Sequence, residues 1–357
     1  MTDLAPRRLP LSTPALPGTG GAERVTEDDF EVEELPLYPA SGAGEHLYVT
    51  VEKRGLSTQD ALREVARALG ADPRDAGYAG LKDKRAVARQ RFSLPWTDER
   101  AAKAAALAGE RWRVLSVERH ANKLRVGHLA ANRFRVRLRA TGPEALPRAA
   151  AILRHLEQFG VPNYFGPQRF GPRQDNAPVG RAVLLGLPEG RRAAYDRFKR
   201  RMVVSALQSE LFNRLCAARV AEASFGAALA GDVLHKRASG GAFVCEDAAV
   251  DGPRCASGEC DPAGPMFGPK LLAARGIPGE REAAVLAEAE LTLEDFAKGG
   301  ADSQGARRPY RVPLDDARAE TDGDGLVVAF RLPRGAYATN VLRELTKLDL
   351  APEGDDA

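Results

Sequence analysis

The sequence predicts a globular fold that mixes β-strands with α-helices. Residues 133–139 alternate strictly between arginine and apolar side chains, as in a strand with one buried face. Residues 57–70 instead carry apolar side chains at helical spacing, between a capping serine or threonine and a terminating glycine. The apolar content of 44% and the charged content of 28% are normal for a chain that folds around a core.

The first 160 residues alternate between predicted strands and predicted helices. In order, we expect an acidic extended edge over 24–37, a strand from 47, a helix over 57–70, a strand over 88–94, a helix over 98–109, strand structure over 111–140 and a helix over 143–159. Gly160 ends this pattern, and an aromatic loop rich in glycine and proline follows over 161–171. The change in composition marks a candidate domain boundary.

The second part of the chain is richer in loops. We expect a long helix over 191–224, a hairpin over 231–245, loops over 247–278, a helix over 280–298, strands over 310–314 and 326–332, and a final helix over 336–348. A chain of 357 residues is long enough for two or three domains.

Composition also bears on location. Residues 1–21 are rich in proline and glycine and lack an apolar signal region, so they predict a disordered lead. No stretch approaches 18 apolar residues, which argues against a membrane span. Four cysteines without a secretion signal indicate reduced thiols in the cytoplasm. The net charge of +3 is small, but arginine is concentrated in particular stretches.

One carboxylate stands out, because Asp83 lies between Lys82 and Lys84 and follows a glycine-containing turn. Neighbouring cations favour the ionised form of an aspartate. An ionised aspartate in basic surroundings suits covalent attack on an electrophilic carbon of a polyanionic substrate. A solvated surface turn is the competing interpretation, and spacing alone favours it.

The four arginines over 133–139 allow two interpretations as well. They would share one face of a strand and could contact phosphates, or they could form an ordinary solvated face. Tyr337, at a predicted strand-to-helix turn, could pack in the core or present its ring to a ligand.

The remaining patterns argue against metal and nucleotide cofactors. Cys245, Cys255 and Cys260 lack the close spacing of zinc ligands, and the five histidines form no tight pair. Neither GxGxxG after a strand nor GxxxxGK[ST] occurs. We therefore expect no cofactor and no metal.

Several ordered motifs together resemble the tRNA pseudouridine synthase D (TruD) family over roughly residues 18–346. The resemblance is carried by Glu27-Asp28-Asp29-Phe30-Glu31-Val32-Glu33-Glu34, Ala79-Gly80-Leu81-Lys82-Asp83-Lys84, Asn132-Arg133-Phe134, Asn163-Tyr164-Phe165-Gly166-Pro167-Gln168-Arg169-Phe170-Gly171 and Pro333-Arg334-Gly335-Ala336-Tyr337-Ala338-Thr339.

The resemblance implies a fold and an activity. Enzymes of this family isomerise a uridine of tRNA, in bacteria at position 13, to pseudouridine without a cofactor or metal. The implied fold is the α+β pseudouridine synthase fold, a mixed sheet flanked by helices, with a family-specific α/β domain inserted at about 161–308. The catalytic domain would then be discontinuous, over 22–160 and 309–350. The implied partner is tRNA, and we expect a cytoplasmic monomer.

The resemblance also assigns roles to residues. Asp83 takes the place of the catalytic aspartate, and the implied substrate-binding residues are Arg24, Phe30, Lys82, Asn132, Phe134 and Tyr337. Phe30 and Tyr337 would stack on an extruded base, and Asn132 would pair with the uracil edge. Relatives often have Phe where this chain has Tyr337, and some have Lys where it has Arg24.

The residues leave the chemical route and two other functions open. Asp83 could attack C1′ of the ribose or C6 of uracil, or assist a route through a glycal. An RNA-binding protein without chemistry and a glycosidase-like hydrolase are the alternatives to an RNA-modifying enzyme. The hydrolase is disfavoured because no second acid lies close to Asp83 in the sequence.

Overall fold

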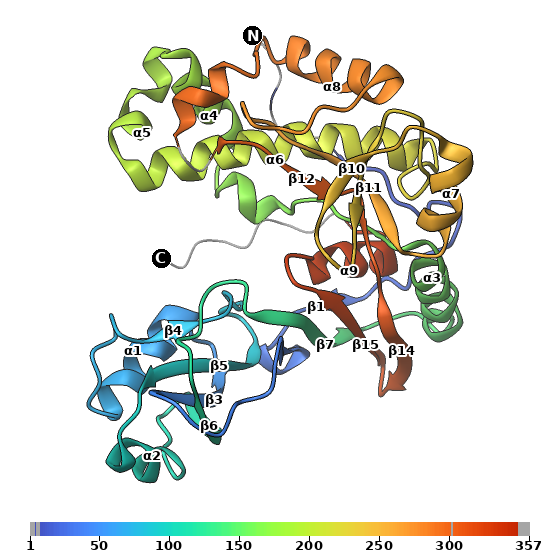
Figure 1. Cartoon of the computed structure of the whole chain (residues 1–357). Coiled ribbons are helices and arrows are strands. Elements are labelled where there is room, and N and C mark those ends of the chain that lie inside the picture. The colour runs from blue at the N-terminus through green and yellow to red at the C-terminus, as the bar shows by residue number, and fades with distance from the viewer. Residues whose placement is uncertain (1–3, 5–7, 301–302, 349–357) are drawn as a thin grey trace. The chain divides into compact units, whose positions relative to one another are not determined.

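Figure 1 shows the computed structural model, which describes residues 4, 8–300 and 303–348. The chain divides into two compact units. The sheet unit comprises Gly18–Glu157 and Leu314–Ala338, and the long-helix unit comprises the described parts of Met1–Pro17, Gln158–Pro313 and Thr339–Ala357. Each unit is therefore assembled from stretches that lie far apart in the sequence.

The sheet unit is built on a mixed β-sheet, as the sequence predicts. Along the sheet the order is β14-β15-β7-β2-β5-β3-β6, with β1 beside β7 and β4 beside β5. The strands are β1 (Ala22–Glu23), β2 (Phe30–Pro36), β3 (His46–Arg54), β4 (Gly77–Tyr78), β5 (Val87–Pro95), β6 (Trp112–His120), β7 (Leu129–Arg139), β14 (Asp315–Asp322) and β15 (Gly325–Pro333). The pairing of β2 with β5 is parallel, whereas β7 pairs antiparallel with both β2 and β15.

Three helices belong largely to this unit: α1 (Thr58–Ala68), α2 (Asp98–Ala104) and α3 (Ala145–Phe159). Helix α1 begins where the Ser57 hydroxyl accepts a hydrogen bond from the Asp60 backbone N–H. Its apolar face buries Leu62 and Val65 in one cluster with Val49 and Phe92 of the sheet. Burying a side chain of this size stabilises the fold by about 1.5–3 kcal/mol, which fixes α1 against one face of the sheet.

The long-helix unit is organised around α6 (Arg197–Ala221), which runs through its middle (Figure 1). The other helices are α4 (Asn176–Leu185), α5 (Arg191–Tyr195), α7 (Ala248–Ala256), α8 (Gly276–Glu288) and α9 (Ala338–Thr346). A Cβ atom on Gly180 of α4 would lie 2.2 Å from the Val203 carbonyl oxygen of α6. Only glycine allows the two helices to approach this closely.

The strands of the long-helix unit form two small sheets. One has the order β10-β9-β11-β12 and the other pairs β13 with β8. Their bounds are β8 (Val161–Pro162), β9 (Val233–Lys236), β10 (Ala242–Val244), β11 (Cys260–Met266), β12 (Ala306–Pro309) and β13 (Arg311–Val312). Short 3-10 helices cover Pro167–Phe170, Pro188–Gly190 and Asp295–Gly299 in this unit, and Glu27–Asp29 in the sheet unit.

Two sequence predictions differ from the structure here. The predicted loops over 247–278 contain α7 and β11, because β9 and β12 supply pairing partners on both sides of a proline-containing segment. The predicted disordered lead over 1–21 does not hold for residues 8–21. The Ser12 and Thr13 backbone N–H groups donate to the buried Glu344 carboxylate at 2.6 and 3.1 Å. Residues 1–3 and 5–7 lie outside the described residues.

Candidate active site

The loop that carries Asp83 joins β4 to β5 in the sheet unit and is tied down by buried side chains. Lys53 Nζ donates to the backbone oxygens of Asp83 at 2.8 Å and Leu56 at 2.5 Å. The Lys82 backbone N–H donates to Thr58 Oγ1 at 2.9 Å. The Asp83 side chain is 28% exposed. A carboxylate on a fixed backbone is thus open to a ligand.

Arg24 lies beside this carboxylate, with its Nη1 atom 3.6 Å from Asp83 Oδ1. The centre of its guanidinium lies 4.0 Å from the centroid of the Phe30 ring, a cation–π contact. The backbone of Arg24 has a φ of 53°, in the left-handed region. That conformation costs a non-glycine residue about 1–3 kcal/mol and is concentrated at functional sites. Arg24 thus adopts a backbone conformation that is uncommon for non-glycine residues, and its guanidinium lies beside Asp83.

Lys82 has a different place from the one the sequence predicts. Its Nζ atom lies 2.8 Å from Glu34 Oε2, and the two side chains are only 4% and 3% exposed. A buried ammonium group that is already paired with a carboxylate does not contact a phosphate. The pair joins the Asp83 loop to β2, and the predicted substrate contact of Lys82 stays a prediction.

Asn132 lies in the same row of the sheet as this ion pair. It is opposite Glu34 of β2 on one side and opposite Leu332 of β15 on the other. Its side chain is buried, and its Oδ1 atom accepts no hydrogen bond from the described residues. Buried amide oxygens normally have a partner, so an unsatisfied one beside Asp83's loop is available to a ligand.

The two phenylalanines of the predicted site pack in the core instead. Phe30 is 1% exposed, and its ring meets Phe134 edge-on at a centroid distance of 5.9 Å. Phe134 in turn lies 5.4 Å from Phe330. In this structure Arg24 and Phe134 cover the Phe30 ring, and the stacking of Phe30 on a base stays a prediction. Phe30 packs directly against Arg24, and Phe134 packs against Phe30.

Tyr337 is half-buried in the turn that follows β15. Strand β15 pairs with β7 as far as Pro333, which is opposite Ala131, and Gly335 has the positive φ of 79° that the turn needs. The turn therefore leaves the sheet one residue beyond the row that contains Asn132. The structure brings the Tyr337 turn into the same unit as Asp83 despite the distance in sequence.

Two charged residues of this region were missed in the sequence. Burial lowers the pKa of Lys53 to about 8, against the opposing effect of Asp83. Burial raises the pKa of the Glu23 carboxyl. The positive charge of Arg24 acts to lower this pKa, and the negative charge of Asp83 acts to raise it further. The sequence could have indicated that Lys53 is buried, because Lys53 falls on the same strand face as the apolar residues Leu47, Val49 and Val51. Nothing in the sequence singles out Glu23.

The four arginines of β7 lie on the opposite face of this sheet, since side chains alternate along a strand. Each faces a carboxylate: Arg133 pairs with Glu33 at 2.7 Å, Arg135 with Glu31 at 3.1 Å, Arg137 with Asp322 at 2.7 Å and Arg139 with Asp29 at 2.7 Å. The predicted phosphate-binding interpretation of this face is not supported, because carboxylates of β2, β14 and the 3-10 turn Glu27–Asp29 already pair with its arginines.

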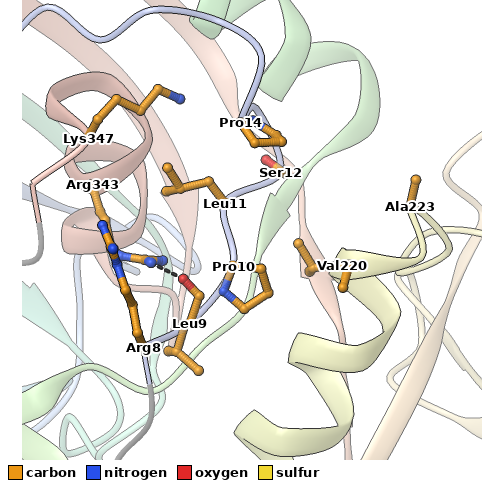
Figure 2. A pocket seen from close by; sticks show the side chains of 11 residues that line it. Arg8, Leu9, Pro10, Leu11, Ser12, Pro14, Val220, Ala223, Arg343 and Lys347 are labelled. Carbon is orange, nitrogen blue, oxygen red and sulfur yellow. Dashed lines mark hydrogen bonds between the residues drawn. The ribbon is translucent and has the colours of Figure 1, made fainter.

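A cavity of about 480 Å³ lies elsewhere, in the long-helix unit (Figure 2). Residues 8–14 form one wall, and the end of α6 with Arg343 and Lys347 forms the others. Arg343 donates to the Leu9 carbonyl (Figure 2). Lys347 donates to the Thr13 carbonyl. The cavity therefore lies between the N-terminal segment, the end of α6 and the side chains of Arg343 and Lys347.

The cysteines contribute no ligand set to either unit. All four are buried, and Cys255 Sγ lies 3.4 Å from Cys260 Sγ. In the described part of the chain, three or more His, Cys, Asp or Glu side chains nowhere gather to hold a metal ion. The same residues include no helix that is long and apolar enough to cross a membrane.

The chain is similar to known proteins over almost its whole length. The family model described as tRNA pseudouridine synthase D (TruD) matches residues 11–197 and 192–345. An Anaeromyxobacter protein named tRNA pseudouridine synthase D is 53% identical over 350 residues, which cover 97% of this chain and 99% of the relative. A Geobacter metallireducens protein of the same name is 40% identical over 395 residues, covering 94% and 97%.

A solved structure is also similar. The crystal structure from Methanosarcina mazei, provisionally named tRNA pseudouridine synthase D (TruD), superimposes with a TM-score of 0.76. It is 25% identical, and the match covers 97% of each chain. The α+β fold predicted from the sequence is thereby confirmed.

Proposed function

The chain belongs to the tRNA pseudouridine synthase D family, and we propose that Asp83 is the catalytic residue with which it isomerises uridine to pseudouridine in tRNA. The single observation that carries this assignment is the partly exposed Asp83 carboxylate 3.6 Å from the guanidinium of Arg24. Position 13 of tRNA is the proposed target, and the cytoplasm the proposed compartment.

The reaction breaks the bond between C1′ and N1 of uridine and joins C1′ to C5. On one route the Asp83 carboxylate bonds to C1′ as the uracil anion leaves with the electron pair. The base then turns, C5 displaces the carboxylate, and the C5 proton moves to a base while N1 gains one. Attack on C6 of uracil and a glycal route use the same carboxylate. All three require the target base to leave its stack, at a cost of a few kcal/mol.

The neighbours of Asp83 take supporting roles in this proposal. Arg24 supplies the counter-charge to the carboxylate, and Lys53 fixes its backbone. Asn132 Oδ1 accepts the N3–H of uracil, since this buried oxygen accepts no hydrogen bond from the described residues. Tyr337 offers the ring that stacks on the extruded base, a role that its half-exposed turn supports better than the buried Phe30.

We also propose that the sheet unit is the catalytic domain and that the inserted domain makes up most of the long-helix unit. The proposed boundaries follow the two units, so they differ from those predicted. Residues 158–160, 309–313 and 339–348, which the sequence analysis assigned to the catalytic domain, group with the long-helix unit. The reason is that β13 pairs with β8 and α9 holds the N-terminal segment.

The test is Asp83→Asn, with Asp75→Asn as a matched change of an exposed aspartate in the same unit. Losing a nucleophile should lower the rate by at least about a thousandfold, while tRNA affinity stays within about twofold. The measurement is carbodiimide mapping of pseudouridine in tRNA, together with tritium release from 5-tritiated uridine. Substantial residual turnover in Asp83→Asn would refute the assignment.

Two outcomes with the unmodified protein separate the alternatives. Binding of tRNA without any pseudouridine would indicate an RNA-binding protein that lacks the chemistry. Release of free uracil would indicate a hydrolase.

A further inference from the structure

A short basic segment, residues 191–202, spans α5 and the start of α6. It contains the six basic residues Arg191, Arg192, Arg197, Lys199, Arg200 and Arg201 but the single acid Asp196. The whole chain is nearly balanced, with 52 lysines and arginines against 49 acids. The segment therefore carries a local excess of positive charge, although the net charge of the whole chain is only +3.

The acid in this segment offsets only part of its charge, since Asp196 Oδ2 lies 4.0 Å from Lys199 Nζ. Asp196 ends α5 and caps α6, where its Oδ1 atom accepts the backbone N–H groups of Phe198 and Lys199 at 2.9 and 3.1 Å. In the described part of the chain no carboxylate lies within ion-pair distance of Arg191, Arg192 or Arg197. Those three cations remain available to an anion.

Two aromatic rings project from the same segment. Tyr195 is 91% exposed and Phe198 is 74% exposed. Large apolar side chains lose hydrophobic stabilisation when they stay in water, so two exposed rings three residues apart indicate a ligand surface. Asp196 marks the break between α5 and α6 (Figure 1), so Tyr195 lies at the end of the short helix α5 and Phe198 in the first turn of the long helix α6.

We propose that residues 191–202 form a contact surface for an unpaired stretch of RNA. Tyr195 and Phe198 stack on bases, and Arg191, Arg192 and Arg197 contact phosphates. Aromatic rings interleaved with cations match single-stranded RNA, which offers both exposed bases and closely spaced negative charges. A membrane surface or an acidic protein lacks the stackable bases. The proposal rests on the proposed function only for the identity of the RNA, a tRNA with its unpaired loops.

The test removes both rings in Tyr195→Ala/Phe198→Ala and compares them with Tyr195→Phe/Phe198→Tyr, which keeps two rings. We expect the dissociation constant for an unmodified tRNA transcript to rise at least about tenfold in the first variant. It should stay within about threefold in the second. The salt dependence of binding should be nearly the same in both, because no charge changes. A fully paired RNA duplex should not distinguish the two variants.

The possible outcomes separate this proposal from the activity. If the protein forms pseudouridine but ring removal leaves tRNA affinity unchanged, the contact surface is wrong. If ring removal weakens RNA binding in a protein that makes no pseudouridine, the surface stands and the proposed function fails. Ring-dependent binding to anionic lipid vesicles, with RNA binding unaffected, would overturn the choice of RNA.

Discussion

Two arginine-rich stretches look alike in the sequence and differ in the structure. Residues 133–139 carry four arginines along β7, and each pairs with a carboxylate. Residues 191–202 carry six basic residues, and their one acid, Asp196, caps α6 and pairs with Lys199. A run of arginines therefore predicts a nucleic-acid surface only when no nearby acid neutralises it.

The pairing of β7 follows from sheet register. Glu31 and Glu33 of β2 lie directly opposite Arg135 and Arg133. The pairing continues across the sheet through Arg89, which lies 3.7 Å from Glu31 and 2.9 Å from Glu52. A strand has neighbours on both sides at fixed spacing, so its charges find partners. The start of α6 has no such neighbour.

The largest effect expected on the paired side comes from Asp29→Asn. Asp29 is 1% exposed, and Arg139 Nε and Nη2 donate to its carboxylate. Removing its charge leaves Arg139 half-exposed without its anion, which should lower the free energy of unfolding by about 2–3 kcal/mol. The measurement is chemical denaturation at neutral pH.

Asp28→Asn is the control for this substitution, because the neighbouring Asp28 side chain is 67% exposed and pairs with the exposed Arg54. Its loss should cost under about 1 kcal/mol. Equal destabilisation by the two variants would mean that burial of the pair does not matter.

The second prediction compares the two stretches directly. Removing two phosphate contacts in Arg192→Ala/Arg197→Ala should reduce the slope of log affinity for tRNA against log salt by about 1.5. Arg133→Ala/Arg135→Ala should change that slope by less than about 0.5, since both arginines already face carboxylates. Binding titrations at four salt concentrations measure both slopes. A reversed order would restore the phosphate-binding interpretation of β7.

The smallest effect is a pH dependence confined to the paired side. Burial of Asp29 opposes ionisation, but hydrogen bonds from Arg139 and the Thr26 backbone outweigh it and lower the pKa. Because the pKa of Asp29 is lower in the folded protein than in the unfolded chain, its ionised carboxylate stabilises the fold above the unfolded pKa of about 3.9. This stabilisation is lost as the pH falls through the folded pKa. The stability gap between the wild type and Asp29→Asn should therefore narrow below about pH 4. A gap that is constant from pH 7 to pH 3 would contradict this origin.

Local patterns in the sequence determined much of the fold and pointed to the centre of the proposed site. The helical spacing and serine cap of α1, the alternation of β7 and the glycine-containing turn before Asp83 are short-range features. Such features restrict the backbone wherever the segment lies in the fold. They sufficed, with the family motifs, to select the α+β fold and to single out Asp83.

Only the tertiary structure decided which groups surround those residues. Lys82 pairs with Glu34, Phe30 lies beneath Arg24, and Lys53 reaches the Asp83 backbone, and each contact joins segments that a sequence pattern treats separately. The same holds for the acids opposite the β7 arginines. The physical reason is that burial and the charge of neighbours depend on strand order and register, which involve residues far apart in the chain.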